Sequence, residues 1–152
     1  MTHIRLMLES EAEAVIDLWN DNCLEAAGAD LSASEAAGVL AALRKYALHP
    51  GAFCLVAEAE SGLVGFLTAH TASHPVLEGL VGEIEELYVR PQARCAGIGS
   101  ALVHQAVARL RQHGAGTMRV HACAESEVAR AFWQGMGWEQ DLVVYSHYEE
   151  TM

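Results

Sequence analysis

The feature that most constrains the fold of this chain is a strand that passes through a short glycine-containing loop directly into a helix. Leu80 to Val89 have the pattern of a strand that stops before Pro91, and Gly99 to His113 carry apolar residues at helical spacing. Glycine lets the backbone approach a ligand closely, and the unpaired N–H groups at a helix N-terminus point at any anion there. Arg94 adds a positive charge in the loop. The segment therefore predicts a cradle for an anion such as pyrophosphate.

The remaining pattern predicts ten elements in the order β-α-α-β-β-β-α-β-α-β. The predicted strands are His3 to Leu8, Phe53 to Ala59, Leu63 to Ala72, Leu80 to Val89, Met118 to Cys123 and Val143 to Tyr148. The predicted helices run from Ser10 to Gly28, from Ser32 to the residues before Pro50, from about Gly99 to His113, and from Ser126 to Met136. No linker or repeat interrupts this order, so we expect one domain over residues 1–152, a mixed α/β (α+β) fold with helices around a central sheet.

Two local signals fix the ends of these elements. Ser10 with Glu13 and Ser32 with Glu35 have the spacing of a capping box, which favours a helix start at each serine. Glu60-Ser61-Gly62 lies between two apolar runs and predicts a hairpin turn.

Charge narrows the class of partner. The net charge is −11, with only nine Lys plus Arg, which argues against nucleic acid, because phosphate backbones need basic patches. A negative field favours a cationic small molecule or a basic peptide, although surplus carboxylates can also serve solubility alone. No apolar run reaches the length of about 18 residues that a membrane helix needs, and residues 1–11 lack the apolar stretch of a signal peptide. The expected location is the cytoplasm, with no membrane partner.

Cysteine and histidine give no sign of a metal site or a disulfide. Cys23, Cys54, Cys95 and Cys123 are scattered and form no CxxC pair. His70 and His74 are four residues apart, but on a strand and a loop this spacing does not bring two ligands to one face. We therefore expect no bound metal.

The exact form of the glycine loop separates it from other phosphate-binding loops. It is neither a GxxxxGK loop followed by Ser or Thr nor a GxGxxG dinucleotide fingerprint. Residues 94–99, Arg-Cys-Ala-Gly-Ile-Gly, match Q/R-x-x-G-x-G/A, the CoA-pyrophosphate loop of the GNAT acetyltransferases. Residues 129–138 resemble the A-x-x-F/L-Y-x-x-x-G-F segment of the same family. The chain is thus similar to GNAT N-acyltransferases: the element order agrees over essentially its whole length, and residues 80–138 carry the specific motifs.

The resemblance implies acetyl-CoA as cosubstrate and a mixed, mostly antiparallel sheet. In the family, two neighbouring strands splay apart and the pantetheine arm pairs with the first strand, here Leu87, Tyr88 and Val89. The residues implied for the pyrophosphate are Arg94, Cys95, Ala96, Gly97, Ile98, Gly99 and Ser100. Ser126 stands where the family often has an Asn near the pantetheine. Trp133 replaces the usual Tyr that protonates the leaving thiolate, and its indole N–H is too weak an acid for that role.

Three carboxylates on the strand before the loop are the candidate catalytic bases. Transfer requires a deprotonated amine, and Glu83 falls where the histone-acetylating branch of the family keeps its general base. By strict alternation Glu83 and Glu85 share one face of the strand and Glu86 points to the other. A bulge, common in the family here, would change that assignment. The alternative is that all three are ordinary solvent-facing residues.

The resemblance places the acceptor site near residues 19–31 and 73–80. Trp19 and Asn22 are the residues we expect there, although Trp19 also fits the buried stripe of its helix and could be a core residue instead.

Two other functions stay open at this stage. The first is a non-catalytic acyl-CoA sensor or partner subunit, which the replacement by Trp133 favours, whereas the glutamate-rich strand favours an enzyme. The second is a nucleotide-binding domain, which the motif forms disfavour. The sequence leaves the oligomeric state open, a homodimer included.

Overall fold

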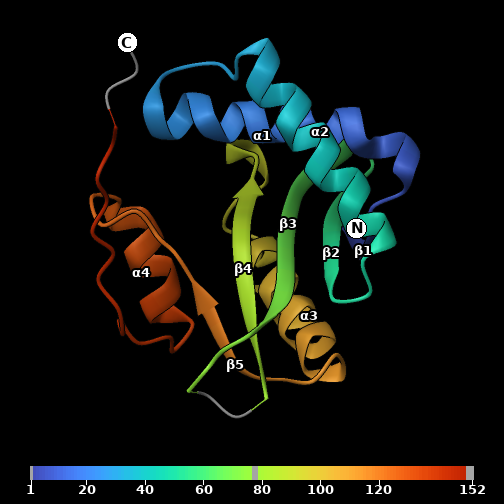
Figure 1. The fold of residues 1–152 in the computed structure, drawn as a ribbon. Coiled ribbons are helices and arrows are strands. Elements are labelled where there is room, and N and C mark those ends of the chain that lie inside the picture. The colour runs from blue at the N-terminus through green and yellow to red at the C-terminus, as the bar shows by residue number, and fades with distance from the viewer. Residues whose placement is uncertain (1, 77–78, 150–152) are drawn as a thin grey trace. The chain divides into compact units, whose positions relative to one another are not determined.

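The computed structural model describes residues 2–76 and 79–149, which form two compact units, Met1–His121 and Ala122–Met152. The first unit contains the sheet and three α-helices, and the second contains one helix and the C-terminal segment (Figure 1). None of the helices within the described ranges is long and apolar enough to cross a membrane.

The sheet has five strands in the order of their sequence. They are β1 (His3–Leu6), β2 (Ala52–Ala59), β3 (Gly62–Ser73), β4 (Leu80–Val89) and β5 (Ala115–Val120). The first four pair antiparallel, whereas β5 runs parallel to β4 because α3 carries the chain back across the sheet. The predicted mixed, mostly antiparallel sheet is confirmed.

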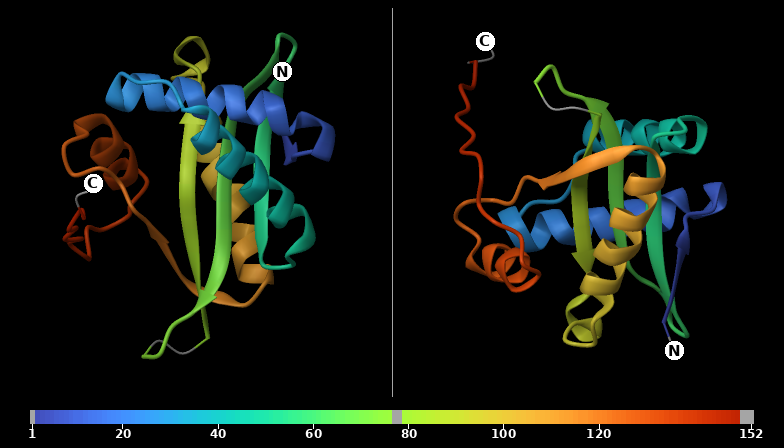
Figure 2. Two further views of the ribbon diagram at one scale, coloured as in Figure 1. Left: turned by 45° about the horizontal axis from the view of Figure 1, so that its top comes forward. Right: turned by 90° about the horizontal axis from the view of Figure 1, so that it is seen from below.

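Helices cover both faces of this sheet (Figure 2). The helices α1 (Ala12–Ala27) and α2 (Ala33–Leu48) lie on one face, and α3 (Ile98–Gln112) lies on the other. The central strands are therefore buried on both sides, which is why β2 is one continuous apolar run with Phe53 to Ala57 all buried. In the second unit, α4 (Glu127–Gly135) is a separate helix.

The core on the α1 and α2 face is formed by alternate residues of the sheet. The buried cluster consists of Ala12, Val15, Leu18, Leu43, Cys54, Val56, Phe66 and Tyr88. On the opposite face α3 packs very close to β4, since a Cβ atom on Gly82 would lie 2.9 Å from Leu110. This packing holds β4 firmly between two layers and so positions the side chains at its end.

The start of α2 agrees with the capping box predicted from the sequence, whereas the start of α1 does not. Ser32 accepts a hydrogen bond from the N–H of Glu35 (3.1 Å), and Glu35 accepts one from the N–H of Ser32 (2.9 Å), so this capping box is confirmed. The box predicted at Ser10 is wrong, because Ser10 lies inside a 3₁₀ turn (Glu9–Glu11).

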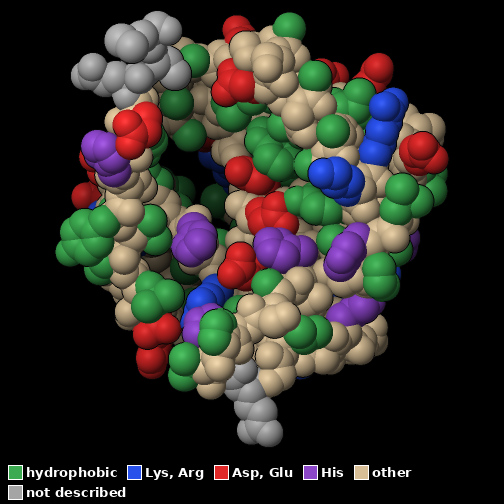
Figure 3. Space-filling model, in the orientation of Figure 1, with side chains coloured by type: hydrophobic (Ala, Val, Ile, Leu, Met, Phe, Trp, Pro, Cys, Tyr) green, Lys and Arg blue, Asp and Glu red, His purple; other side chains and the backbone are tan. Residues whose placement is uncertain are grey.

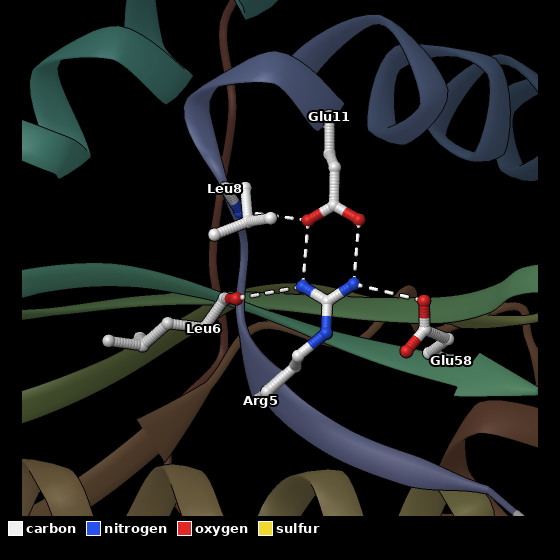
Figure 4. Close-up of polar contacts among 5 residues, drawn as sticks. All are labelled: Arg5, Leu6, Leu8, Glu11 and Glu58. Atoms are coloured by element: carbon white, nitrogen blue, oxygen red, sulfur yellow. Dashed lines mark hydrogen bonds and ion pairs between the residues drawn. The ribbon is translucent and has the colours of Figure 1, made fainter.

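The carboxylate of Glu11 supports that turn instead of the predicted box. It accepts a hydrogen bond from the N–H of Leu8 at 2.8 Å and bidentate hydrogen bonds from Arg5, both at 2.7 Å (Figure 4). Arg5 also donates to Glu58 of β2 at 3.3 Å, so one guanidinium joins β1, the turn and β2.

Two predicted strands differ from the structure. The fifth strand is predicted at Met118 to Cys123, but β5 begins three residues earlier, because parallel pairing with β4 starts at Ala115 opposite Leu80. The final strand predicted at Val143 to Tyr148 does not form, and these residues have no secondary structure. Val143 and Tyr145 are 68% and 92% exposed, so their strand-favouring side chains have neither a packing surface nor a ladder partner in the described part of their unit.

Candidate functional site

The strands β4 and β5 separate halfway along β4. Their pairing runs from Leu80 opposite Ala115 to Ile84 opposite Val120 and then stops, whereas β4 continues to Val89 against β3. Residues 85–89, which include Leu87, Tyr88 and Val89, thus have no partner strand on the β5 side among the described residues. Backbone N–H and C=O groups on that side are available to an extended ligand that can hydrogen-bond as a strand does.

The glycine loop follows directly at the end of this free edge. A 3₁₀ turn (Pro91–Ala93) leads into Cys95 and Gly97, which adopt left-handed φ angles of 64° and 78°. Gly97 is the N-cap of α3, so the N–H groups of Ile98, Gly99 and Ser100 lie in the first turn, where no helical carbonyl is available to them. Nothing lies within 4 Å of where a Cβ of Gly97 would be. The loop backbone is open to a bulky anion, and the N–H groups of the first turn of α3 suit an anion such as pyrophosphate.

Arg94 stands beside this loop but is held by a carboxylate of α1. Its guanidinium donates to both oxygens of Glu25, at 2.7 and 2.6 Å, and its Nε donates to the carbonyl of Val89 at 2.8 Å. The hydrogen bonds from Arg94 lower the pKa of Glu25. The guanidinium also lies 5.6 Å from the ring centroid of Tyr88. Arg94 therefore connects the end of β4 to α1, and the phosphate of a ligand would compete with Glu25 for it.

A bulge in β4 brings the three candidate carboxylates to one face of the sheet. Ile84 is opposite Ala69 and Glu86 is opposite Thr68, so Glu85 has no partner in β3. Strict alternation does not hold here. Glu83, Glu85 and Glu86 all contact residues of β3, α1 or α2 on the α1 and α2 face. Figure 3 shows acidic and histidine side chains close together on this side of the molecule.

Glu85 is the centre of a polar cluster that contains two residues not expected from the sequence. The hydroxyl of Tyr46 in α2 donates to Oε2 of Glu85, and Nδ1 of His70 in β3 contacts Oε1. The other ring nitrogen of His70, Nε2, lies 3.6 Å from Oε2 of Glu83. Burial and the hydrogen bond to Glu85 raise the pKa of Tyr46, so its hydroxyl stays a donor at neutral pH.

Glu86 is a partly buried carboxylate that contacts α1. Burial raises its pKa above the ordinary carboxyl value, while the hydrogen bond from Asn22 of α1 (3.0 Å) opposes that shift. Its cross-strand neighbour Thr68 is fully buried, and the hydroxyl of Thr68 has no hydrogen-bond partner within residues 2–76 and 79–149. A polar group left unpaired in this position costs free energy unless a water or a ligand satisfies it.

The two residues predicted to bind the acceptor lie in different surroundings. Asn22 is part of the polar cluster through Glu86. Trp19 stacks on Phe66 with ring centroids 5.4 Å apart and packs against the hydrophobic core. Its environment is that of a core residue, and a role for it in acceptor binding stays a prediction.

Ser126 and Trp133 belong to the second unit. The hydroxyl of Ser126 caps α4 by accepting the N–H of Ala129 at 3.2 Å. Trp133 is 8% exposed and packs against Phe132 and Trp138, with centroids 5.0 and 4.8 Å away. Their predicted roles beside CoA stay predictions.

Sequence reasoning missed His70 and Tyr46. A signal for His70 existed, because it is a polar residue inside an apolar strand that is buried on both faces. Tyr46 gave no such signal, since an aromatic residue fits the apolar stripe of α2. In the described ranges no group of three His, Cys, Asp or Glu side chains could hold a metal ion.

Comparison with known proteins gives a family for this arrangement. The family model described as "Acetyltransferase (GNAT) family" matches residues 13–138. A curated relative, the mycothiol acetyltransferase of Paenarthrobacter aurescens, is 29% identical over 101 residues. That match covers 62% of this chain but only 30% of the relative, so the chain spans less than a third of the length of that protein.

Solved structures share the fold at low sequence identity. A transcriptional regulator from Bacillus halodurans superposes with a TM-score of 0.83 at 19% identity, over 97% of this chain and 100% of the other. An aminoglycoside N-acetyltransferase in complex with CoA superposes with a TM-score of 0.82 at 17% identity, over 99% and 96% of the two chains.

Proposed function

Since this chain belongs to the acetyltransferase (GNAT) family, we propose that it transfers the acetyl group of acetyl-CoA to an amine of a small molecule or peptide. The observation that carries this proposal is the free edge of β4, residues 85–89, which leads directly into the open loop at the start of α3. An extended arm with amide groups and a pyrophosphate fits these two features in sequence. The acetyl-CoA of the family has both parts.

The chain would hold the cosubstrate mainly through its backbone. Leu87 to Val89 would pair with the amides of the pantetheine arm as a further strand does. The N–H groups of the first turn of α3, with Arg94 released from Glu25, would bind the pyrophosphate. The thioester then lies toward Glu85, where β4 and β5 separate.

The acidic face of β4 supports a cationic amine as the acceptor. Glu83, Glu85 and Glu86 attract an ammonium group, and its proton must be removed before the nitrogen lone pair can attack the thioester carbon. We propose direct attack in a ternary complex. The C–S bond breaks as the amide forms, and the thiolate needs no strong acid to leave, because its ordinary pKa is about 8.5. This suits a chain in which Trp133 replaces the usual tyrosine.

The chemistry of the acceptor follows from charge more than from shape. The net charge of −11 and the acidic cluster favour a polyamine, an amino sugar or a basic peptide over a neutral amine. The aminoglycoside N-acetyltransferase with the same fold has an acceptor class that fits this description.

The test of the proposed function is turnover with an amine panel. Purified protein is incubated with acetyl-CoA and an aminoglycoside, glucosamine 6-phosphate, spermidine or a peptide with a free N-terminus, and CoA thiol release is followed with mass detection of the acetylated amine. We expect turnover of at least one cationic amine. Binding of acetyl-CoA without turnover on any amine would favour the non-catalytic sensor instead.

A pair of variants at Gly97 tests the loop itself. Gly97→Glu places bulk and negative charge where the pyrophosphate would lie, whereas Gly97→Ala imposes only the conformational cost of a left-handed residue, about 1 kcal/mol. Acetyl-CoA at about 100 times its Kd should stabilise the wild type by about 2.7 kcal/mol. The Ala variant should keep most of this stabilisation and the Glu variant should lose it. Equal stabilisation of all three proteins would rule out the loop as the binding site.

A further inference from the structure

We propose that His70 takes the proton from the acceptor amine, that Glu85 and Tyr46 position its ring, and that Glu83 binds the ammonium group beside it. This inference rests on the proposed acetyl transfer and names a residue for one of its steps. His70 would then be a catalytic residue, Glu85 and Tyr46 positioning residues, and Glu83 an acceptor-binding residue.

The hydrogen bonds of Glu85 determine the tautomer of His70. Tyr46 donates its hydroxyl proton to Oε2 of Glu85, so that oxygen accepts. An ionised carboxylate has no proton to give, so the contact between Oε1 and Nδ1 of His70 requires the proton to be on Nδ1. In the neutral ring the lone pair is then on Nε2. The arrangement of carboxylate, imidazole and free Nε2 is one that many enzymes use to hold a histidine base.

The free nitrogen of His70 faces the second carboxylate across a gap that an amine can bridge. Nε2 and Oε2 of Glu83 are 3.6 Å apart, which is too long for a direct hydrogen bond. A single nitrogen placed at hydrogen-bond distance from both atoms fits this separation. The side chains of His70 and Glu83 are 33% and 32% exposed, so both can be reached from solvent. An ammonium group would donate one proton to Nε2 and another to Glu83.

The position of this pair along β4 matches the expected reaction centre. Glu85 is the first residue of β4 beyond the last pair with β5, and it is also the bulge residue. The thioester of a cosubstrate bound along residues 87–89 would therefore point toward the segment that His70 contacts. The polar cluster around Glu85 and the free edge of β4 are independent observations, and both include Glu85.

Protons and electrons balance in the proposed acetyl transfer. One proton of the ammonium moves to Nε2 of His70, and the nitrogen lone pair forms a bond to the thioester carbon. The C–S bond then breaks, and its electron pair leaves on sulfur. The nitrogen gives a second proton to the thiolate, so that the products are the amide and CoA thiol. His70 releases its proton to solvent, which balances the single proton lost overall.

The expected pH dependence involves every charged group around the ring. His70 faces Glu83 and Glu85 of β4, Tyr46 of α2 joins the cluster through Glu85, and Glu86 is one residue further along β4. A base acts only through a free lone pair, so the wild-type activity should depend on pH on the acid side of its profile. In His70→Asn this dependence should disappear, leaving only the ionisation of the acceptor amine itself.

The test uses His70→Asn with His104→Asn as a matched control, since His104 is exposed on α3. Asparagine can still donate a hydrogen bond to Glu85, but it has no nitrogen that can accept a proton. The variant therefore separates a structural role of His70 from a catalytic role. With the amine that the panel selects, kcat/KM of His70→Asn should fall by about 10²- to 10⁴-fold, while the acetyl-CoA thermal shift stays at the wild-type value. A wild-type rate or an unchanged pH profile in His70→Asn would overturn the proposal.

A second measurement needs no substrate at all. In ¹⁵N-histidine-labelled protein, the ring of His70 at neutral to alkaline pH should give the spectrum of the Nδ1–H tautomer, and Glu85→Gln should remove that preference. An Nε2–H tautomer in the wild type would refute the assignment even if the enzyme is active. Conversely, absence of acetyl-CoA binding in the wild type would refute the proposed function, and the tautomer would still report the arrangement of the cluster.

Discussion

Arg5 joins three segments of the chain that are distant from the acidic face. Its guanidinium contacts both oxygens of Glu11 and one oxygen of Glu58, and Glu11 also accepts the N–H of Leu8 (Figure 4). The side chains of Arg5 and Glu11 are 23% and 18% exposed, so solvent screens the pair only in part. A charge-assisted pair with two parallel hydrogen bonds is among the stronger polar contacts in a protein.

Glu11→Gln should lower the free energy of unfolding by about 1–3 kcal/mol at neutral pH. Hydrogen bonds from Arg5 hold the pKa of Glu11 below the ordinary value of 4.5. A lowered carboxyl pKa stabilises the fold above the ordinary value, and this contribution is lost as the pH falls through the folded pKa. The difference between wild type and variant should therefore shrink below about pH 4.5, as measured by urea unfolding at several pH values. Glu13→Gln, on the exposed side of α1, serves as control and should change little.

At the residue level, the sequence was informative where a residue acts through the backbone and weaker where it acts through distant side chains. The sequence predicted the loop that begins at Arg94, because the left-handed conformation of Gly97 is a local property. It also singled out Glu83, Glu85 and Glu86. It could not predict that Glu85 meets His70 and Tyr46, because those contacts depend on strand register and on where α2 crosses the sheet.

Among the elements, β4 has two halves with different surroundings. Residues Leu80 to Ile84 pair on both sides, with β3 and with β5, whereas residues 85–89 pair only with β3. Backbone N–H groups in the second half that point away from β3 therefore depend on solvent or a ligand for a hydrogen bond.

Acetyl-CoA should slow amide hydrogen exchange in this second half of β4. If the pantetheine pairs with Leu87 to Val89, the N–H groups directed away from β3 gain a partner and should exchange at least several-fold more slowly. Amides of Leu80 to Ile84, which already pair on both sides, should change much less and provide the internal reference. Hydrogen exchange measured by NMR with and without acetyl-CoA checks this. Protection confined to α3, with none in residues 85–89, would contradict pairing along the strand.

Local signals also explain which elements could be predicted. The limits of β4 were predicted correctly, because Pro91 and a loop bound it, and α2 was predicted from its capping box. The predicted limits of β5 were three residues too late in the sequence, and the strand predicted at Val143 to Tyr148 does not form. Strand limits depend on which strand lies alongside, and a sequence pattern of period two contains no information about that.

At the scale of the whole molecule, charge is the dominant property. With 20 Asp plus Glu against nine Lys plus Arg, the protein attracts cations and repels anions over several ångströms. The acceptor proposed here is a cation, and the proposed cosubstrate acetyl-CoA is an anion, so the same field would act on the two in opposite directions.

Raising the salt concentration should therefore raise the KM of the cationic acceptor without raising the KM of acetyl-CoA. The Debye length falls from about 10 Å at 0.1 M to about 3 Å at 1 M ionic strength. We expect the KM of a polycationic acceptor such as spermidine to rise several-fold over this range, and the KM of acetyl-CoA to stay constant or fall. Initial rates at four or five salt concentrations are sufficient, with a singly charged amine as the comparison. A KM for the polycation that falls with salt would exclude an electrostatic contribution to acceptor binding.

The bulge at Glu85 has a consequence for how this chain can diversify. In a regular strand successive side chains point to opposite faces of the sheet. Each residue on the face that carries the site therefore lies between two residues whose side chains belong to the core. The extra residue in β4 relaxes this restriction, because Glu83, Glu85 and Glu86 share one side while Ile84 and Tyr88 remain buried. Descendants of this chain could exchange the three acidic positions for other side chains and acquire new acceptors, while inheriting the same packed interior unaltered.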